Sequence, residues 1–371
     1  MRGWYDQSAP SATGELRPVR NNTSGVVEQL GSGHQWLLHS RGFGKAHNKV
    51  NEFWAAATAG AAASLIIWAM VPLMKQYAVD IPNSRSSHLV PTPRGGGLGI
   101  LAGAAVYLSL RGAWSNEVAA VCIGITIVAV LGLFDDVRGL SRRLRLSVQI
   151  VIALAMISLV TTAYSRSADP KLLVIIVGTI WLSGYTNAFN FMDGINGISA
   201  MSTILAAGWY AWLCSSLGFT GGFELSVAIL VGALAFLPWN YPRATIFMGD
   251  VGSYGIGFGI ACLAVLAWVN GASPLQSLAP LLLYCSDTAW TLSRRIVRRE
   301  AWWEAHRDHI YQRLSRGRLG STRVPLLVSA VSAGICLLSA ANVTQATAWT
   351  LIVLGLASYL ASPQVIGGSA Q

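Results

Sequence analysis

Long apolar stretches recur along the chain between residues 53 and 361, and short polar segments separate them. A helix needs about 20 mostly apolar residues to cross a bilayer, and eleven stretches come close to this length. Their apolar positions are continuous, which excludes the alternating pattern of membrane-spanning β-strands. We therefore predict an all-α polytopic membrane protein with ten or eleven transmembrane helices, since the stretches near Leu172 and Leu225 could be partly re-entrant. The predicted spans are Phe53–Met74, Gly96–Leu110, Val118–Phe134, Leu146–Tyr164, Leu172–Tyr185, Ile198–Leu217, Leu225–Trp239, Val251–Val269, Leu275–Leu292, Val324–Ala341 and Ala346–Ala361.

The composition supports the lipid bilayer as the solvent of this chain. Hydrophobic residues make up 53% of the 371 positions and charged residues only 11%, and the mean hydropathy is +0.50. This leaves too little polar surface to cover a soluble globule of that size. The first 52 residues differ, because they are polar and lack the apolar segment of a cleavable signal peptide. We expect a weakly structured tail over residues 1–52 and an integral-membrane domain over residues 53–365.

The basic residues are distributed unevenly among the loops. Of 26 Lys and Arg residues, 17 fall in odd-numbered loops, 3 in even-numbered loops and 6 in the amino-terminal tail. The positive-inside rule places the odd loops in the cytoplasm and the amino terminus outside, although the tail's basic residues argue against this orientation. The net charge of +10 suits anionic lipid headgroups and a phosphorylated substrate. We expect no nucleic-acid partner, because the basic residues do not form one soluble module.

The first odd loop carries the sequence Pro-Thr-Pro-Arg-Gly-Gly-Gly at residues 91–97. Backbone N–H groups of glycines at a helix start can receive a phosphate, and Arg94 and His88 would assist. The alternative is a hinge at which helices pack closely. The glycine-rich sequence alone favours this alternative.

Two odd loops place carboxylates where a helix meets the membrane surface. Asp135 and Asp136 repel each other, and a shared divalent cation or proton would relieve that repulsion. The alternative is a solvated loop in which the following arginines balance the acids. Asp250 stands between glycines at the start of an apolar helix and needs a partner. Arg243 or a metal ion could supply it, or Asp250 could instead cap the helix.

The segment between the fifth and sixth spans contains no basic residue. Asn187, Asn190 and Asp193 follow one another at intervals of three, which places them near one helical face. Gly194 and Gly197 come directly after and allow a turn or a close backbone approach. This pattern favours a carboxamide and carboxylate site over a simple helix cap.

The last odd loop is rich in hydrogen-bond donors. His306, Arg307 and His309 could bind a diphosphate through charge-assisted hydrogen bonds. Histidines spaced three apart could instead ligate a metal. Asp287 lies inside the ninth predicted span and is either part of a site or paired with a nearby arginine.

Five motifs, taken in order, resemble the polyprenyl-phosphate N-acetylhexosamine-1-phosphate transferases, which include MraY-type, WecA-type and WbpL-type enzymes. The resemblance extends over nearly all of residues 53–361. Each motif is weak alone, whereas five in the same order are highly specific. The motifs are Pro-Thr-Pro-Arg-Gly-Gly-Gly at 91–97, Phe-Asp-Asp at 134–136, Asn-Phe-Met-Asp-Gly-Ile-Asn-Gly at 190–197, Phe-Met-Gly-Asp-Val-Gly-Ser at 247–253 and His-Arg-Asp-His-Ile-Tyr-Gln-Arg at 306–313.

The resemblance implies transfer of a sugar 1-phosphate from a UDP-N-acetylhexosamine to undecaprenyl phosphate, with release of UMP and a requirement for Mg²⁺ or Mn²⁺. It also implies a multi-pass protein of the bacterial inner membrane, which we expect can form a homodimer. Asp250 resembles the metal-binding aspartate, and Asp135 and Asp136 resemble the paired acidic motif that handles metal or lipid phosphate. Asp135 is our first choice for a base. The expected catalytic residues are Asp135, Asp136, Asp193 and Asp250, and the expected substrate-binding residues are His88, Arg94, Asn187, Asn190, Asn196, His306, Arg307 and His309.

Two departures from the family pattern indicate which branch of the family the sequence resembles most. Many members carry Asp at the position of Asn196, and many have more histidines in the final motif. Both features are closer to the WbpL-type branch, which begins O-antigen or similar polysaccharides. A transporter is the rival function, but only Asp287 is plainly within the membrane and we find no internal repeat. A catalytically inactive scaffold of the same fold is the third alternative.

Overall fold

The computed structural model describes residues 27–82, 90–164, 171–301, 303–304 and 306–365. The chain divides into two compact units, Met1–Asn51 and Glu52–Gln371. Helix α1 runs from Val27 to Tyr77, so helix is present within the segment expected to be weakly structured. A helix that continues a formed span needs no new nucleation. Residues 1–26 lie outside the described residues.

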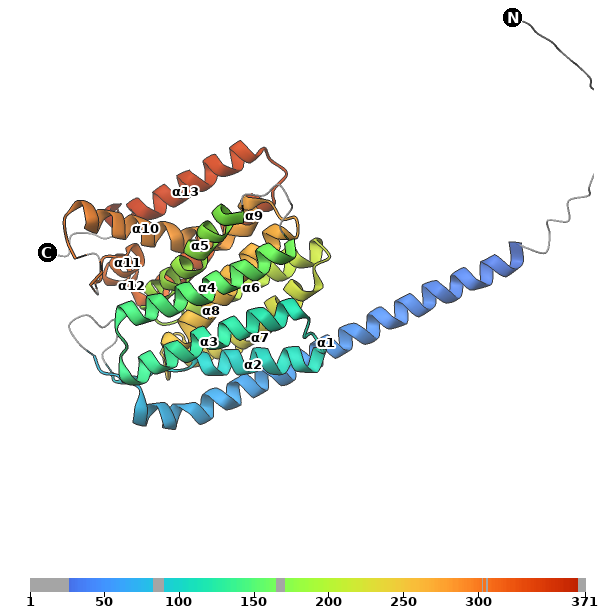
Figure 1. Cartoon of the computed structure of the whole chain (residues 1–371), viewed down its shortest axis with the longest axis horizontal. Helices are drawn as coiled ribbons and strands as arrows, with labels where there is room; N and C mark the ends of the chain where they lie inside the picture. Colours follow the sequence, from blue (N-terminus) through green and yellow to red (C-terminus); the bar gives the residue numbers. More distant parts are fainter. Residues whose placement is uncertain (1–26, 83–89, 165–170, 302, 305, 366–371) are drawn as a thin grey trace, which may run out of the picture. The chain divides into compact units, whose positions relative to one another are not determined.

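The described part of the second unit consists of helices and one two-stranded sheet (Figure 1). Strand β1 (Val79–Asp80) pairs antiparallel with β2 (Thr92–Pro93). The remaining elements are α2 (Gly97–Arg111), α3 (Asn116–Arg138), α4 (Arg142–Tyr164), α5 (Lys171–Met192), α6 (Ile198–Ser216), α7 (Thr220–Asn240), α8 (Gly249–Val269), α9 (Pro274–Leu278), η1 (Ala279–Leu281), α10 (Leu282–Val297), α11 (Ile310–Arg316), α12 (Gly320–Ala340) and α13 (Gln345–Val365).

All eleven predicted spans fall on helical segments, and the all-α polytopic fold is confirmed. Among the described residues, nine helices are long and apolar enough to cross a membrane. The second predicted span corresponds to α2, a shorter apolar helix of 15 residues. The ninth, predicted at Leu275–Leu292, divides into α9, η1 and α10. Pro280 explains the division, because proline lacks the N–H that a continuous helix requires.

Helix α8 forms the centre of the bundle and packs against α2, α3, α5, α6 and α7. Its glycines allow close approach, as small residues do between membrane helices. A Cβ atom on Gly97 of α2 would lie 2.1 Å from the Cα atom of Gly252. A Cβ atom on Gly132 of α3 would lie 2.2 Å from the carbonyl oxygen of Asp250. The close packing of α3 therefore fixes the start of α8, where Asp250 lies.

This packing predicts that Gly132→Ala destabilises the protein by about 1–3 kcal/mol, because the added methyl group overpacks the α3–α8 contact. Thermal unfolding in detergent would measure the change. Gly184→Ala is the matched control, since a Cβ atom on Gly184 of α5 meets no atom within 4 Å. Equal melting temperatures for the two variants would contradict the prediction.

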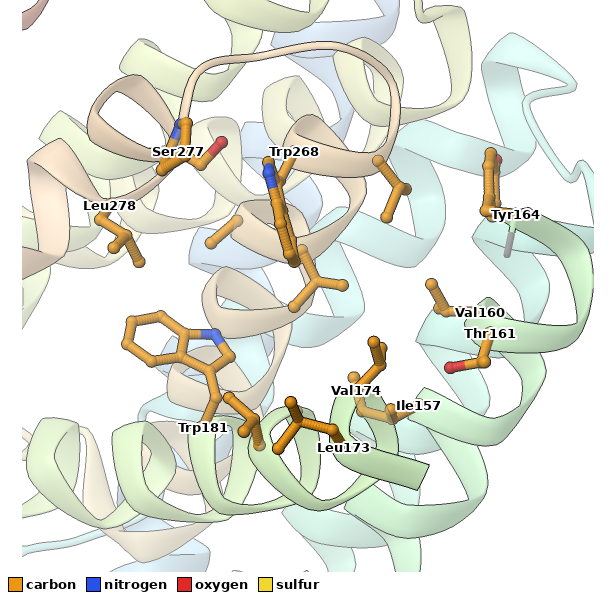
Figure 2. Close-up of a pocket in the computed structure, with 16 residues that line it drawn as sticks. Ile157, Val160, Thr161, Tyr164, Leu173, Val174, Trp181, Trp268, Ser277 and Leu278 are labelled. Carbon is orange, nitrogen blue, oxygen red and sulfur yellow. The ribbon is translucent and has the colours of Figure 1, made fainter. Parts of the chain in front are cut away.

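A cavity of about 750 Å³ lies between α4, α5, α8 and α9 (Figure 2). Its lining comes from the carboxyl-terminal halves of α4 and α8 and from the first half of α5, and it includes Tyr164, Leu173 and Trp268. The sixteen lining residues include no carboxylate, histidine or basic side chain. This cavity cannot bind phosphates through opposite charge, and the polar motifs belong to the other ends of the same helices.

Candidate active site

The first and fourth motifs are joined backbone to backbone. Gly96 and Gly97 donate their N–H groups to the carbonyl oxygens of Phe247 and Met248 at 2.8 and 2.9 Å, and Phe247 donates its own N–H to Pro93 at 2.8 Å. The N–H groups of Gly96 and Gly97 are therefore already bonded and do not form the phosphate cradle considered above. The alternative, close packing, is confirmed. His88 lies outside the described residues.

Asp136 is directed into the contact between these two motifs. Its side chain is only 1% exposed, and its Oδ1 lies 3.9 Å from Nη1 of Arg94. Its Oδ2 accepts a hydrogen bond from the N–H of Val251 at 3.1 Å. Gly249 adopts a φ of +74°, and a Cβ atom there would lie 2.6 Å from Oδ2 of Asp136. Glycine is thus required at position 249, both for its backbone conformation and for the room it leaves to Asp136.

Asp135, the adjacent carboxylate, has both oxygens engaged. Its Oδ1 accepts the N–H of Leu140 at 2.7 Å, and its Oδ2 is bonded to Arg145 and, at 3.2 Å, to the hydroxyl of Tyr254. Arg145 also lies 3.8 Å from Oδ2 of Asp250. A carboxylate with this many donors is a poor proton acceptor. The contacts of Asp135 favour holding Arg145 over acting as a base or a metal ligand.

Asp250 lies in the first turn of α8 and makes its hydrogen bond to a different helix. Asn190, near the end of α5, donates from Nδ2 to Oδ1 of Asp250 and to the hydroxyl of Ser253, both at 2.8 Å. The cap position of α8 is Met248, with no side-chain cap bond. Asp250 is therefore not the helix cap, and Arg145 rather than Arg243 is its basic neighbour.

Asp193 of the third motif and the nearby Asn187 have different surroundings. Asp193 follows α5, and burial raises its pKa to about 7; the charge of Asp136 acts in the same direction, whereas the Ser199 hydroxyl and Arg94 oppose it. Asn187 points elsewhere, because its Nδ2 bonds Oε1 of Gln149 on α4 at 2.6 Å. The amide of Asn187 is thus engaged by α4, and binding of a substrate by Asn187 stays a prediction.

Asn196 connects two loops. Its Nδ2 donates to the carbonyl oxygen of Pro242 at 3.2 Å, and its side chain is partly exposed. It lies in the turn that leads from Asp193 into α6. Its contact therefore stabilises the turn, and binding of a substrate by Asn196 stays a prediction.

The last loop packs against the third motif through α11. Tyr311 donates its hydroxyl to the carbonyl oxygen of Phe191 at 2.9 Å, and a Cβ atom on Gly194 would lie 2.2 Å from that hydroxyl oxygen. Nδ1 of His309 lies 3.1 Å from Oδ1 of Asp287. Asp287 thus pairs with a histidine rather than with an arginine.

His306 and Arg307 complete the basic side of the loop. The rings of His306 and His309 have centroids 5.0 Å apart. Burial lowers the pKa of His306 to about 4, and the charge of Arg295 adds to this effect. His306 is therefore neutral near pH 7, and its buried Nδ1 has no hydrogen-bond partner among the described residues. Arg307 is partly buried, and its carbonyl oxygen accepts a bond from Arg316 at 2.5 Å.

Part of the chain matches a known protein family, and several known enzymes are similar to it in sequence. The sequence pattern described as "Glycosyl transferase family 4" matches residues 118–268. A probable undecaprenyl-phosphate N-acetylglucosaminyl 1-phosphate transferase from Bacillus subtilis is 27% identical, over 77% of this chain and 84% of the relative. A decaprenyl-phosphate N-acetylglucosaminephosphotransferase from Mycobacterium leprae is 29% identical, over 68% and 73%. Over residues 118–268 the chain is thus similar to glycosyl transferase family 4, and the names of these relatives agree with that likeness.

A third relative has a different donor in its name. The phospho-N-acetylmuramoyl-pentapeptide-transferase of Lactobacillus delbrueckii is 28% identical, over 47% of this chain and 61% of the relative. The segment that matches the family pattern holds all four predicted catalytic aspartates and Asn190, whereas Arg94 and the histidine loop (residues 306–313) lie outside it. The family match thus includes the predicted acidic residues of the site but not Arg94 or the histidine loop.

Two carboxylates of the site have an oxygen that is left for a divalent cation. Oδ1 of Asp136 is buried and accepts no hydrogen bond from the described residues, and Oδ2 of Asp250 lies 3.8 Å from Arg145, beyond hydrogen-bond distance. Mg²⁺ commonly takes one or two carboxylates, waters and substrate phosphates. The described residues form no cluster of three or more His, Cys, Asp and Glu side chains suited to a metal. Asp136 and Asp250 are therefore the residues that would hold Mg²⁺.

Two residues of the site were not predicted from the sequence. Arg145 joins Asp135 to Asp250, but in the sequence it stands in a run of arginines that a positive-inside signal explains equally well. Asn240, the last residue of α7, accepts the N–H of Gly197 at 2.7 Å and donates to Ile246 at 3.1 Å. In the sequence, Asn240 is distinguished only as an amide side chain among apolar residues at the end of a predicted span.

Proposed function

We propose that the protein transfers an N-acetylhexosamine 1-phosphate from a UDP-sugar to undecaprenyl phosphate, releasing UMP, at the cytoplasmic face of the bacterial inner membrane. The product would begin an O-antigen or a similar cell-envelope polysaccharide. One observation carries the proposal: five separate segments bring together the guanidinium groups of Arg94 and Arg145, the carboxylates of Asp136 and Asp250, and the carboxamide of Asn190. The N–H of Val251, next to Asp250, joins Asp136 to this network. The names of the relatives support the reaction class.

The chemistry requires that negative charges approach one another. An oxygen of the lipid phosphate attacks the phosphorus that bears the sugar, and the bond from that phosphorus to the oxygen of UMP breaks. When bound, Mg²⁺ would neutralise charge on the diphosphate. Asp136 and Asp250 would hold it, while Arg94 and Arg145 would neutralise phosphate oxygens. The lipid phosphate is largely ionised near neutral pH, so the step needs no strong base.

Purified protein with undecaprenyl phosphate, Mg²⁺ and a panel of UDP-N-acetylhexosamines tests the proposal. We expect UMP release with at least one donor, and the panel also separates N-acetylglucosamine from the sugars of the WbpL-type branch. No UMP from any donor, under conditions in which a related enzyme is active, would rule out the enzymatic function and leave the scaffold or transporter.

Asp193 predicts a pH dependence. Its pKa of about 7 means that it is mostly protonated below pH 7 and ionised above. If the carboxylate form takes part, kcat/KM rises with pH through about 7 and then levels off. The folded state favours the protonated acid, so this group's stabilising contribution is present at low pH and is lost as pH rises from about 4 to 7.

The Asp193→Asn variant separates this ionisation from that of the lipid phosphate. We expect the variant to lose the inflection near pH 7 and to keep one near pH 6, where a phosphate takes its second proton, to within about one pH unit. A full pH profile of kcat/KM in both proteins would show this. An unchanged inflection near pH 7 in Asp193→Asn would exclude Asp193 as its source.

A further inference from the structure

Asp287 of α10 is a carboxylate buried inside the protein, and the histidine loop supplies most of its donors. Its side chain is 0% exposed. Oδ1 contacts Nδ1 of His309 at 3.1 Å and the N–H of Ile310 at 2.9 Å, and Oδ2 accepts the N–H of Tyr311 at 3.1 Å. A buried carboxylate is costly unless it is well hydrogen-bonded. These bonds make Asp287 the anchor of the first turn of α11.

Two hydroxyl groups complete the environment of Asp287. Thr291, one turn further along α10, donates to Oδ1 at 3.2 Å, and Tyr359 of α13 donates to Oδ2 at 2.8 Å. None of the five donors is Lys or Arg. The carboxylate is therefore held by oriented dipoles and one imidazole, and the Tyr359 hydroxyl connects α13 to the carboxylate that holds the histidine loop.

The contact between Asp287 and His309 determines which ring nitrogen carries the proton. Two backbone N–H groups and two hydroxyls already donate to Asp287, so we infer that the carboxylate accepts from His309 as well. Nδ1 of His309 is then the donor, and Nε2 of a ring with one proton is the acceptor. The same carboxylate sets the position of Tyr311, whose hydroxyl bonds Phe191 and lies against Gly194, next to Asp193. Asp287 thus positions the histidine loop directly, and it positions the third motif through Tyr311.

We propose that Asp287 is a positioning residue of the active site, which fixes the tautomer of His309 and holds α11 against the Asn190–Gly197 segment, with Tyr359 orienting the carboxylate. The inference rests on the proposed function and on the prediction that His306, Arg307 and His309 bind substrate, which we take to be the nucleotide-sugar donor. Asp287 and Tyr359 both lie outside the residues 118–268 that match the family. A residue that acts only on stability would leave donor affinity and the tautomer unchanged in the folded protein.

The test compares Asp287→Asn and Tyr359→Phe with Tyr210→Phe in the full-length protein. Tyr210→Phe is the matched control, because it removes a buried hydroxyl that donates to Ser277 at 2.7 Å, away from the loop. We expect the KM for the UDP-sugar to rise about 10- to 100-fold in Asp287→Asn and about three- to tenfold in Tyr359→Phe, since misplaced contacts weaken binding steeply. The KM for undecaprenyl phosphate should stay within about twofold in all three.

Histidine ¹⁵N NMR gives a readout that needs no substrate. The His309 signals are identified by their loss in His309→Gln. We expect a protonated Nδ1 in the wild type, and a proton on Nε2 in Asp287→Asn, because the asparagine amide can donate to Nδ1. An unchanged tautomer together with an unchanged donor KM in Asp287→Asn would overturn the proposal.

Two further outcomes keep the test decisive. If Asp287→Asn does not fold, the comparison of Tyr359→Phe with Tyr210→Phe decides, and equal donor KM values would overturn the proposal. If the wild type releases no UMP, the proposed function fails, while the NMR result still reports whether Asp287 fixes the tautomer.

Discussion

Asp250→Asn should lower kcat by about three orders of magnitude while the protein stays folded and inserted. The variant removes one of the two carboxylates that would hold Mg²⁺, and loss of such electrostatic stabilisation costs at least about 10²–10³ in rate. Folding should survive, because the amide oxygen of the introduced asparagine can still accept the bond from Asn190 that now holds Asp250 at 2.8 Å. Initial rates of UMP release over a range of Mg²⁺ concentrations would measure both kcat and the metal requirement.

The matched control is Glu117→Gln, an acid-to-amide change at the start of α3, where Glu117 bonds Tyr164. This position lies at the opposite end of α3 from Asp135 and Asp136, and we expect kcat within about twofold of the wild type. Near-normal turnover in Asp250→Asn would remove Asp250 from the site. A loss of activity of similar size in both variants would indicate a general effect of removing carboxylates.

Arg145→Ala should reduce both activity and stability. Arg145 contacts Asp135, Tyr254 and Asp250, and its loss leaves two carboxylates near each other without a shared cation. Breaking a buried ion pair costs about 3–5 kcal/mol. We expect the lower part of this range, because the Arg145 side chain is 26% exposed. The rate should fall about 100-fold, since one phosphate-neutralising group is lost.

Arg143→Ala is the control for this prediction, because Arg143 is exposed two residues earlier on the same helix. Its stability should stay within about 0.5 kcal/mol of the wild type. Thermal unfolding and UMP release, measured on the same preparations, would show both effects. If Arg145→Ala behaves like Arg143→Ala, then Asp135 and Asp250 do not depend on Arg145. Arg145→Lys should rescue only part of the activity, because an ammonium group cannot bridge two carboxylates as a planar guanidinium does.

The sequence predicted the helices and the motifs better than the contacts between them. Apolar stretches report burial in lipid directly, and each of the eleven coincides with a helical segment. Helical spacing predicted that Asn187, Asn190 and Asp193 share one face. It could not show that Asn187 bonds Gln149 of α4. Spacing determines which residues share a face, whereas the neighbouring helix determines what that face meets.

The partners of the acidic residues could not be predicted for a similar reason. Asp250 is close in sequence to Arg243, yet its contacts come from Asn190 and Arg145. The glycine-rich sequence at residues 91–97 could not distinguish a phosphate cradle from a tight helix crossing, because both need residues without a side chain. The hydrogen bonds of the Gly96 and Gly97 N–H groups and the packing of Gly97 on Gly252 separate the two. Long-range pairing depends on topology, and a single sequence does not contain it.

The backbone bonds between residues 93–97 and 247–248 have a consequence for how this protein could be altered. Main-chain hydrogen bonds do not depend on which side chains the residues carry, provided that the glycines remain. The side chain of Arg94 can thus be exchanged without breaking the backbone bonds between the two loops. A segment covering residues 91–97 from a relative should therefore graft into this chain as an interchangeable module, with its docking retained and its chemistry replaced.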